Sequence, residues 1–292
     1  MFLLRNPARV VFEATKNFDR DHCFDQAATI SYFALLSVLP LSYLLIAMGA
    51  WVVGSVDAAE RGLELVLKDL VQTLGPDIFS QARQMGSQLG RQGWPFLFIA
   101  LWTASKVFSK VESALDRVFQ VENRRSFPVR KIFAFALVAV LALAMLVLLV
   151  LSSAVATFNR FVDSTALVVA KSNPLYIALD NMASRYFAPW LLTLFTFSFV
   201  YKVVPACVVS WRAAGLAGLV AGSLWEVIKN LFAWYAGNIA DYARTYGTLE
   251  TVVVFIIWVN LSSVLLLWGG EIAALESGAR HAPVKEPVGE PG

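Results

Sequence analysis

The feature that most constrains this chain is an apolar run from Ile132 to Phe158, in which 27 consecutive residues carry no charge. About 20 apolar residues suffice for a helix to cross the ~30 Å hydrocarbon core of a bilayer. No water is available there to bond the backbone, so a helix is the expected structure. The whole chain is 58% hydrophobic and 15% charged, which excludes an ordinary soluble domain.

Further apolar segments give the chain an expected all-α, polytopic fold with six transmembrane helices in a single membrane domain, residues 1–276. The predicted spans cover about 27–53, 94–111, 132–158, 186–204, 213–237 and 249–275. A helical hairpin at 57–90 is expected on the outer surface, because two apolar stripes flank Gly75-Pro76. Residues 277–292 are rich in proline and glycine and are expected to form a disordered cytoplasmic tail.

The distribution of lysine and arginine predicts the orientation. With both termini in the cytoplasm, the cytoplasmic segments hold 15 basic residues and the outer segments hold eight. Basic residues are enriched in cytoplasmic loops, so this orientation is favoured, with 54–93 and 159–185 outside. No cleavable signal peptide is expected, since Met1–Leu4 is too short for its apolar core.

The N-terminal part of the chain leaves two interpretations open. Residues 5–26 place apolar and basic side chains near helical spacing, which suits either a helix along the membrane surface or a positively charged lead-in. The first span is polar in its first half, with Ser31, Tyr32 and Ser37. Pro40 should kink that span, either to shape a cavity or simply for helix packing.

The stretch from Trp211 to Leu275 holds the polar groups of greatest interest. Glu226 and Lys229 lie three residues apart and therefore on one helical face. A charge at bilayer depth costs several kcal/mol unless it is paired or wetted. The two residues are therefore either a structural lock within the bundle or a functional site for a proton or a headgroup. Small residues at four-residue spacing, Ala214, Gly218 and Gly222, predict close approach of another helix.

A candidate polar path through the membrane combines these groups with polar residues of other spans. Its members are Glu226, Lys229, Asn230, Asn260, Glu271, Lys106, Ser31, Tyr32, Ser37 and Pro40. We expect Asn260 to bond across to the fifth or first helix. We expect Glu271 to face cytoplasmic basic groups such as Lys106.

Several short motifs occur along the spans. They are Ser31-Tyr-Phe-Ala-Leu-Leu-Ser-Val-Leu-Pro-Leu, Leu101-Trp-Thr-Ala-Ser-Lys, Tyr201-Lys-Val-Val-Pro, Tyr246-Gly-Thr-Leu, Trp258 and Leu267-Trp-Gly-Gly-Glu-Ile-Ala. Together they resemble the YihY/virulence factor BrkB family of bacterial inner-membrane proteins. The resemblance covers residues 20–276 and implies six helices in the inner membrane, with links to envelope and lipid phenotypes but no settled activity. Gly270 departs from the family pattern, which has alanine before Glu271.

Members of that family were once labelled ribonuclease BN, but the sequence argues against a nuclease or any other enzyme. Hydrolysis of phosphodiesters usually needs metals held by clustered His, Asp or Glu, whereas the only histidines are His22 and His281. No metal, cofactor or nucleic-acid site is expected, and no Walker motif occurs. A basic cluster suits anionic lipid headgroups instead and comprises Arg124, Arg125, Arg130 and Lys131.

Two function classes remain. One is a transporter or lipid translocase, with a possible inverted repeat of three plus three helices. Short echoes favour that repeat, since Leu101-Trp…Lys106 matches Leu224-Trp…Lys229 and Tyr32-Phe-Ala matches Tyr186-Phe-Ala. The other class is an envelope scaffold or assembly partner that transports nothing. The expected partners are membrane lipids, with envelope proteins and further copies of the chain as additional candidates.

Overall fold

The computed structural model describes residues 6–53, 94–122, 187–238 and 250–279, together with pairs of residues at 125–126, 128–129, 132–133 and 135–136. These residues form helices and turns and contain no strand. The helices are α2 (Pro7–Arg20), α3 (Cys23–Val53), α6 (Trp94–Val118), α10 (Ala188–Val203), α11 (Trp211–Asn238) and α13 (Glu250–Ser277). An all-α fold is therefore confirmed.

Five of the predicted spans correspond to described helices, and their ends agree within four residues except at one place. Helix α6 continues to Val118, seven residues beyond the predicted end at 111. The third predicted span lies outside the described residues apart from 132–133 and 135–136, as do the hairpin at 57–90 and residues 280–292. Two helices, Trp211–Ala236 and Val252–Ser277, are long and apolar enough to cross a membrane by length and composition.

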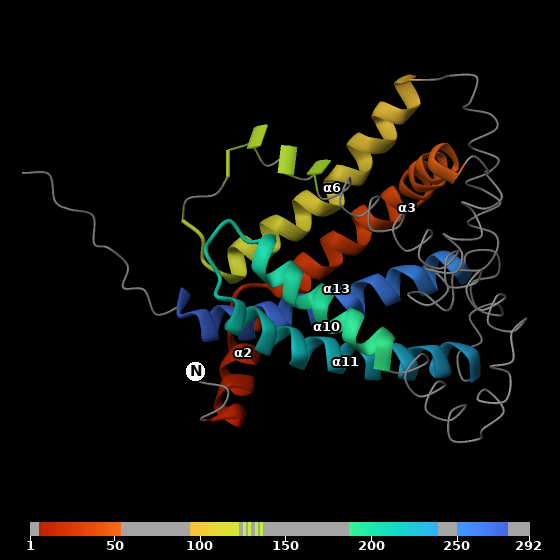
Figure 1. The fold of residues 1–292 in the computed structure, drawn as a ribbon. Coiled ribbons are helices and arrows are strands. Elements are labelled where there is room, and N and C mark those ends of the chain that lie inside the picture. The colour runs from red at the N-terminus through yellow and green to blue at the C-terminus, as the bar shows by residue number, and fades with distance from the viewer. Residues whose placement is uncertain are drawn as a thin grey trace, which may run out of the picture.

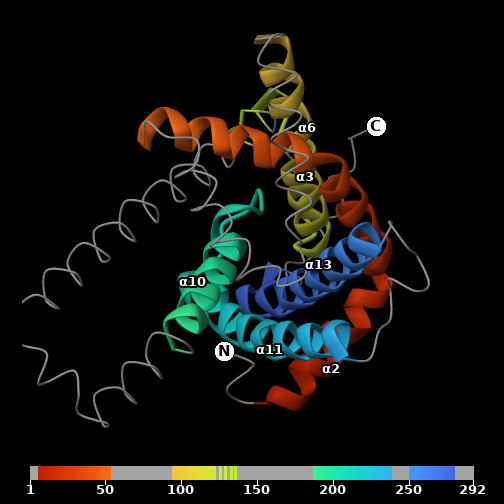
Figure 2. The same cartoon turned by 90° about the vertical axis from the view of Figure 1, so that its right-hand side faces the viewer.

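Helices α3, α6, α10, α11 and α13 run back and forth between two sides of the bundle at angles to one another, and α2 lies across one of these sides (Figure 1). The first residues of α3 and α11 and the last residues of α6, α10 and α13 lie on the same side, next to α2. Both described ends of the chain therefore emerge on this side. In Figure 2, α13 lies between α11 and the pair formed by α3 and α6.

Glycines allow the helices to approach closely. A Cβ atom on Gly218 of α11 would overlap the Ser198 hydroxyl of α10 and come within 2.8 Å of the Ser198 backbone nitrogen. At Gly222 a Cβ would lie 3.2 Å from the Cα of Leu194. The predicted close approach at Gly218 and Gly222 is thus confirmed, and the neighbour is α10.

Helix α13 has a second close approach near its C-terminal end. A Cβ on Gly269 would overlap the hydroxyl of Tyr201, which donates a 3.0 Å hydrogen bond to the Leu266 carbonyl. At Gly270 a Cβ would lie 3.0 Å from the side chain of Leu115 on α6. Glycine at 270, the departure from the family pattern, therefore suits the tight packing of α13 on α6. Gly278 has φ +76°, a left-handed conformation that suits glycine just after a helix end.

Helix α2 packs against the protein by one side. Val10, Ala14 and Phe18 are buried, and the Trp268 indole of α13 donates to the Thr15 hydroxyl at 3.2 Å. Val11 and Phe12 remain exposed on the other side. Of the two interpretations of residues 5–26, a helix is confirmed over Pro7–Arg20, and its contact with a membrane surface stays a prediction.

Candidate functional site

The α11 ion pair consists of Glu226 and Lys229, whose Oε2 and Nζ atoms are 2.7 Å apart. The two side chains are only 15% and 10% exposed. Thr193 of α10 donates a hydrogen bond of 2.6 Å to the other carboxylate oxygen, Oε1. Asn230 is exposed and bonds to the Glu226 backbone carbonyl at 2.7 Å. Both oxygens of Glu226 therefore have a partner, as the cost of burying a carboxylate requires.

Aromatic and hydroxyl groups surround this ion pair. The Lys229 ammonium lies 5.2 Å from the centre of the Trp225 ring, a cation–π geometry. The Trp225 indole donates to Ser262 of α13 at 3.3 Å, and the Trp190 indole of α10 donates to Ser223 at 3.1 Å. Polar contacts thus connect α11 to α10 on one side and to α13 on another.

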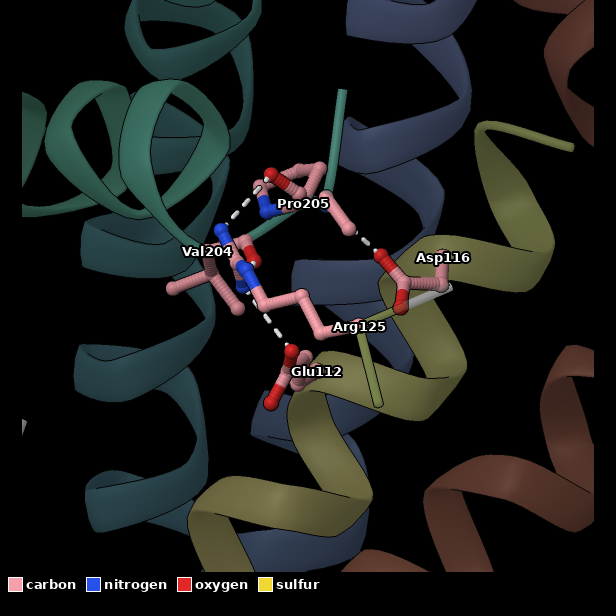
Figure 3. Close-up of polar contacts among 6 residues, drawn as sticks. Glu112, Asp116, Arg125, Val204 and Pro205 are labelled. Carbon is pink, nitrogen blue, oxygen red and sulfur yellow. Dashed lines mark hydrogen bonds and ion pairs between the residues drawn. The ribbon is translucent and has the colours of Figure 1, made fainter. Parts of the chain in front are cut away.

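The Arg125 cluster lies where the end of α6 meets the turn between α10 and α11, residues 204–210 (Figure 3). Arg125 donates to the Glu112 carboxylate at 2.8 Å and to the carbonyls of Val204 at 2.9 Å and Pro205 at 3.4 Å. Its guanidinium also lies 3.9 Å from the centre of the Phe133 ring. The planar guanidinium therefore joins three parts of the chain at once.

Asp116 completes the Arg125 cluster one helical turn after Glu112. Its Oδ1 atom accepts a 2.8 Å hydrogen bond from the backbone N–H of Ala206 (Figure 3). Glu112 and Asp116 are both buried, which explains why α6 continues past the predicted end at 111. Both carboxylates contact other parts of the protein.

Cys207 lies beside the Arg125 cluster in the turn between α10 and α11. Burial raises the pKa of its thiol, and the nearby Asp116 carboxylate raises it further, while Arg125 opposes the shift. The cysteine is half-buried and forms no disulfide. The pKa of the Cys207 thiol therefore depends on the charges of Asp116 and Arg125.

The remaining members of the predicted path are spread over the bundle. Ser31 and Ser37 are buried and donate to the carbonyls of Ala28 and Phe33 in their own helix, whereas Tyr32 is exposed. Helix α3 continues through Pro40, whose side chain is outside the described set. The structure therefore brings together Glu226, Lys229 and Asn230 but not these residues of α3.

Two expected contacts of α13 are not found in the described part of the chain. Asn260 is half-buried and makes no side-chain hydrogen bond with another described residue. Glu271 is fully buried and accepts a weak 3.8 Å hydrogen bond from the Cys23 thiol, while Lys106 lies over Trp102. Lys106 and Glu271 therefore form no ion pair with each other, and contact of Glu271 with other cytoplasmic basic groups stays a prediction.

Several site residues were missed by the sequence interpretation. Thr193 carries no signal, because a threonine in an apolar helix is common and only the fold brings it to Glu226. Arg125 was predicted to contact anionic lipids, and the structure gives it partners within the protein; Arg124, Arg130 and Lys131 lie outside the described residues. The spacing of Glu112 and Asp116 on one face of α6 was the one available signal.

Comparison with known proteins places these features in a family. Residues 14–288 match the family described as virulence factor BrkB. A UPF0761 membrane protein of Legionella pneumophila is 30% identical over 91% of this chain and 61% of its own length. The ribonuclease-like protein YfkH of Bacillus subtilis is 27% identical over 90% of this chain and 93% of its own length.

The chain spans about three fifths of the length of the UPF0761 relatives from Legionella and Alkalilimnicola. No solved structure matches it significantly. The family match covers nearly the whole chain, including the Arg125 cluster and the α11 ion pair. The chain therefore belongs to the virulence factor BrkB family and is an integral membrane protein.

Proposed function

We propose that this chain is a multi-pass protein of the bacterial inner membrane that transports a polar solute or translocates a lipid. The observation that carries the proposal is the α11 ion pair. At a rise of 1.5 Å per residue, Glu226 lies ~22 Å from Trp211 and ~18 Å from Asn238, so it is close to the middle of α11. Charges at that depth mark ion and substrate pathways or structural pairs.

The arrangement of the helices supports six spans with both termini in the cytoplasm. Both described ends lie on one side of the bundle, together with the end of α6 and the end of α10. The Arg125 cluster joins the end of α6 to the turn that follows α10. The 15-to-8 distribution of basic residues favours the cytoplasm as that side. Cys23 and Cys207 then both lie at the end of the bundle on the reducing side, in keeping with two free thiols.

An inverted three-plus-three repeat is part of the proposal. Helices α3 and α6 pack as a pair, as do α10 and α11, and these are the first two spans of each proposed half. The repeated Leu-Trp…Lys motif makes the same contact in both: Lys106 lies 5.3 Å from the Trp102 ring centre and Lys229 lies 5.2 Å from that of Trp225. Inverted repeats are common in transporters that alternate their access.

In this proposal the Arg125 cluster closes the cytoplasmic side of the protein during alternating access. Glu112 and Asp116 belong to the first half, and the backbone of 204–206 belongs to the second. The cluster therefore joins the two halves on the proposed cytoplasmic side. The hydrogen bonds of the cluster break when the protein opens toward the cytoplasm, and they re-form when the protein closes on that side.

A static envelope scaffold is the second candidate. It is favoured by the complete pairing of Glu226, whose two oxygens are bonded to Thr193 and Lys229. A ribonuclease activity is not part of the proposal. The described residues hold no group of three or more His, Cys, Asp or Glu side chains placed to bind a metal ion, so the name of YfkH is not carried over.

Sealed vesicles test the proposal. Lipid asymmetry and the uptake of small solutes are measured in vesicles with the wild-type protein, with Glu226→Gln, and with Glu13→Gln as an exposed control. Transport predicts that wild-type vesicles differ from empty ones and that Glu226→Gln folds but loses the activity. A scaffold predicts no transport by the wild type. It also predicts that Glu226→Gln and Lys229→Met each lower stability while the double variant recovers much of it.

A further inference from the structure

Two lysines on α6 have similar surroundings and belong neither to the Arg125 cluster nor to the α11 ion pair. Lys106 and Lys110 lie one helical turn apart and are both half-buried. The Lys106 ammonium lies 5.3 Å from the centre of the Trp102 ring, and the Lys110 ammonium lies 5.0 Å from the centre of the Phe33 ring of α3. Each positive charge is therefore held against an aromatic face.

Lys229 of α11 has a carboxylate partner, which Lys106 and Lys110 lack within the described residues. Lys229 has the same tryptophan four residues earlier and, in addition, the Glu226 carboxylate at 2.7 Å. The residue three positions before Lys106 is Thr103, which cannot supply a charge. Within the described part of the chain, neither Lys106 nor Lys110 has an oxygen partner.

The acidic residues of α6 are directed elsewhere. Glu112 follows Lys110 by two positions, and residues two apart do not share a helical face. Its carboxylate binds Arg125, and the Asp116 carboxylate binds the backbone of Ala206. The two carboxylates of α6 therefore do not pair with Lys106 or Lys110.

Both lysines lie within α6, and Lys110 is ~12 Å from the end of that helix at Val118. Lys106 is the central residue of α6, ~18 Å from either end. Phe33, the ring beneath Lys110, lies ~15 Å along α3 from Cys23. Because the predicted second span ends at 111, both lysines lie in its cytoplasmic half. An ammonium group inside the membrane requires an anion or water, because an aromatic ring does not neutralise its charge.

We propose that Lys106 and Lys110 form a binding site for a phosphate-bearing anion, with Trp102 and Phe33 as its aromatic walls. Two ammonium groups one turn apart match an anion with several acceptor oxygens, and charge-assisted bonds to phosphate are strong. The anion is the headgroup of an anionic phospholipid, which has a net negative charge, or free phosphate. The site requires only that α6 lies in the membrane, and it stands whether or not the protein transports.

Nanodiscs test this site and separate the two sources of phosphate. The thermal unfolding midpoint of the full chain is measured in phosphatidylcholine alone, with increasing phosphatidylglycerol, and in phosphatidylcholine with inorganic phosphate. We expect stabilisation of the wild type by at least one of the two anions. Stabilisation by phosphatidylglycerol alone identifies a headgroup site, and stabilisation by inorganic phosphate identifies a free-anion site. In Lys106→Gln/Lys110→Gln the half-saturating anion level should rise about tenfold or the shift should vanish.

Matched variants make the result decisive. Lys16→Gln removes an exposed lysine of α2 and should keep the full shift, whereas Lys110→Gln alone should lose part of it. If the double variant does not fold in phosphatidylcholine, Lys110→Gln alone replaces it in the comparison. Absence of any shift in the wild type, an unchanged shift in the α6 variants, or an equal loss in Lys16→Gln would overturn the site. None of these outcomes depends on the transport activity of Glu226→Gln.

Discussion

Asp116 and Ala206 lie 90 positions apart in the sequence, and the Asp116 carboxylate accepts a 2.8 Å hydrogen bond from the backbone N–H of Ala206. Arg125 joins the same two regions through Glu112 and the Val204 carbonyl. The end of α6 is thereby tied to the turn between α10 and α11 by charged side chains (Figure 3). This contact could not be inferred from either segment alone.

Loss of Arg125 should destabilise the protein. In Arg125→Met the buried Glu112 carboxylate loses its guanidinium partner, and we expect a loss of about 2–3 kcal/mol, below the ~3–5 kcal/mol of a fully buried pair. The reduction reflects the 22% exposure of the Arg125 side chain. Thermal unfolding in detergent measures the effect. The exposed pair Arg9–Glu13 supplies the control, since Arg9→Met should change stability by less than ~0.5 kcal/mol. Equal effects of the two variants would contradict the structural role of Arg125.

Thr193 should contribute to stability through its hydroxyl alone. Thr193→Val removes the donor that bonds Glu226 at 2.6 Å, and a hydrogen bond to a charged group is worth about 1.5–3 kcal/mol. Thr193→Ser keeps the hydroxyl and should unfold close to the wild-type temperature. Thr196 is exposed and bonds only to the Leu192 carbonyl of its own helix, so Thr196→Val is the control. If Thr193→Val and Thr196→Val behave alike, the bond to Glu226 has no energetic importance.

The packing of α11 on α10 should depend on which glycine is replaced. Gly218→Ala places a methyl group against the backbone of Ser198 and should separate the helices, with a loss of about 1–3 kcal/mol for overpacking. At Gly215 a Cβ would meet nothing within 4 Å, so Gly215→Ala should be neutral or gain up to ~1 kcal/mol from helix propensity. Unfolding temperatures of the two variants test the contrast. A stable Gly218→Ala protein would refute the close contact at this position.

Cys207 should titrate above the ordinary range of a thiol. Its pKa is raised by burial and by Asp116 and is lowered by Arg125, so maleimide labelling in a Cys23→Ala background should become fast only at alkaline pH. Asp116→Asn keeps an acceptor for Ala206 and should move the labelling midpoint to lower pH, whereas Arg125→Met should move it higher. Because the folded pKa exceeds the unfolded one, the thiol stabilises the fold below the unfolded pKa, and this contribution is lost as pH rises through the folded value. The reagent should act from the cytoplasmic side, and labelling from the outer side alone would reverse the proposed orientation.

Much of the architecture followed from local patterns. Apolar runs predicted the helices that became α3, α10, α11 and α13 to within four residues, because burial in lipid and helix formation both depend on consecutive apolar side chains. The small residues of α11 predicted a close neighbour, although not which helix it would be. The end of α6 was predicted too early, because the sequence alone does not show that Glu112 and Asp116 are buried.

The sequence by itself determined that this chain is helical, that it belongs in a membrane and that Glu226 and Lys229 share a helical face. Those properties depend on composition and on spacing within one segment. Only the tertiary structure decided that Thr193 completes the pairing of Glu226 and that Arg125 turns inward to Glu112. Such contacts join residues far apart in the chain, and a buried charge accepts any partner that satisfies its hydrogen bonds, so the choice among many threonines and arginines is made by packing alone.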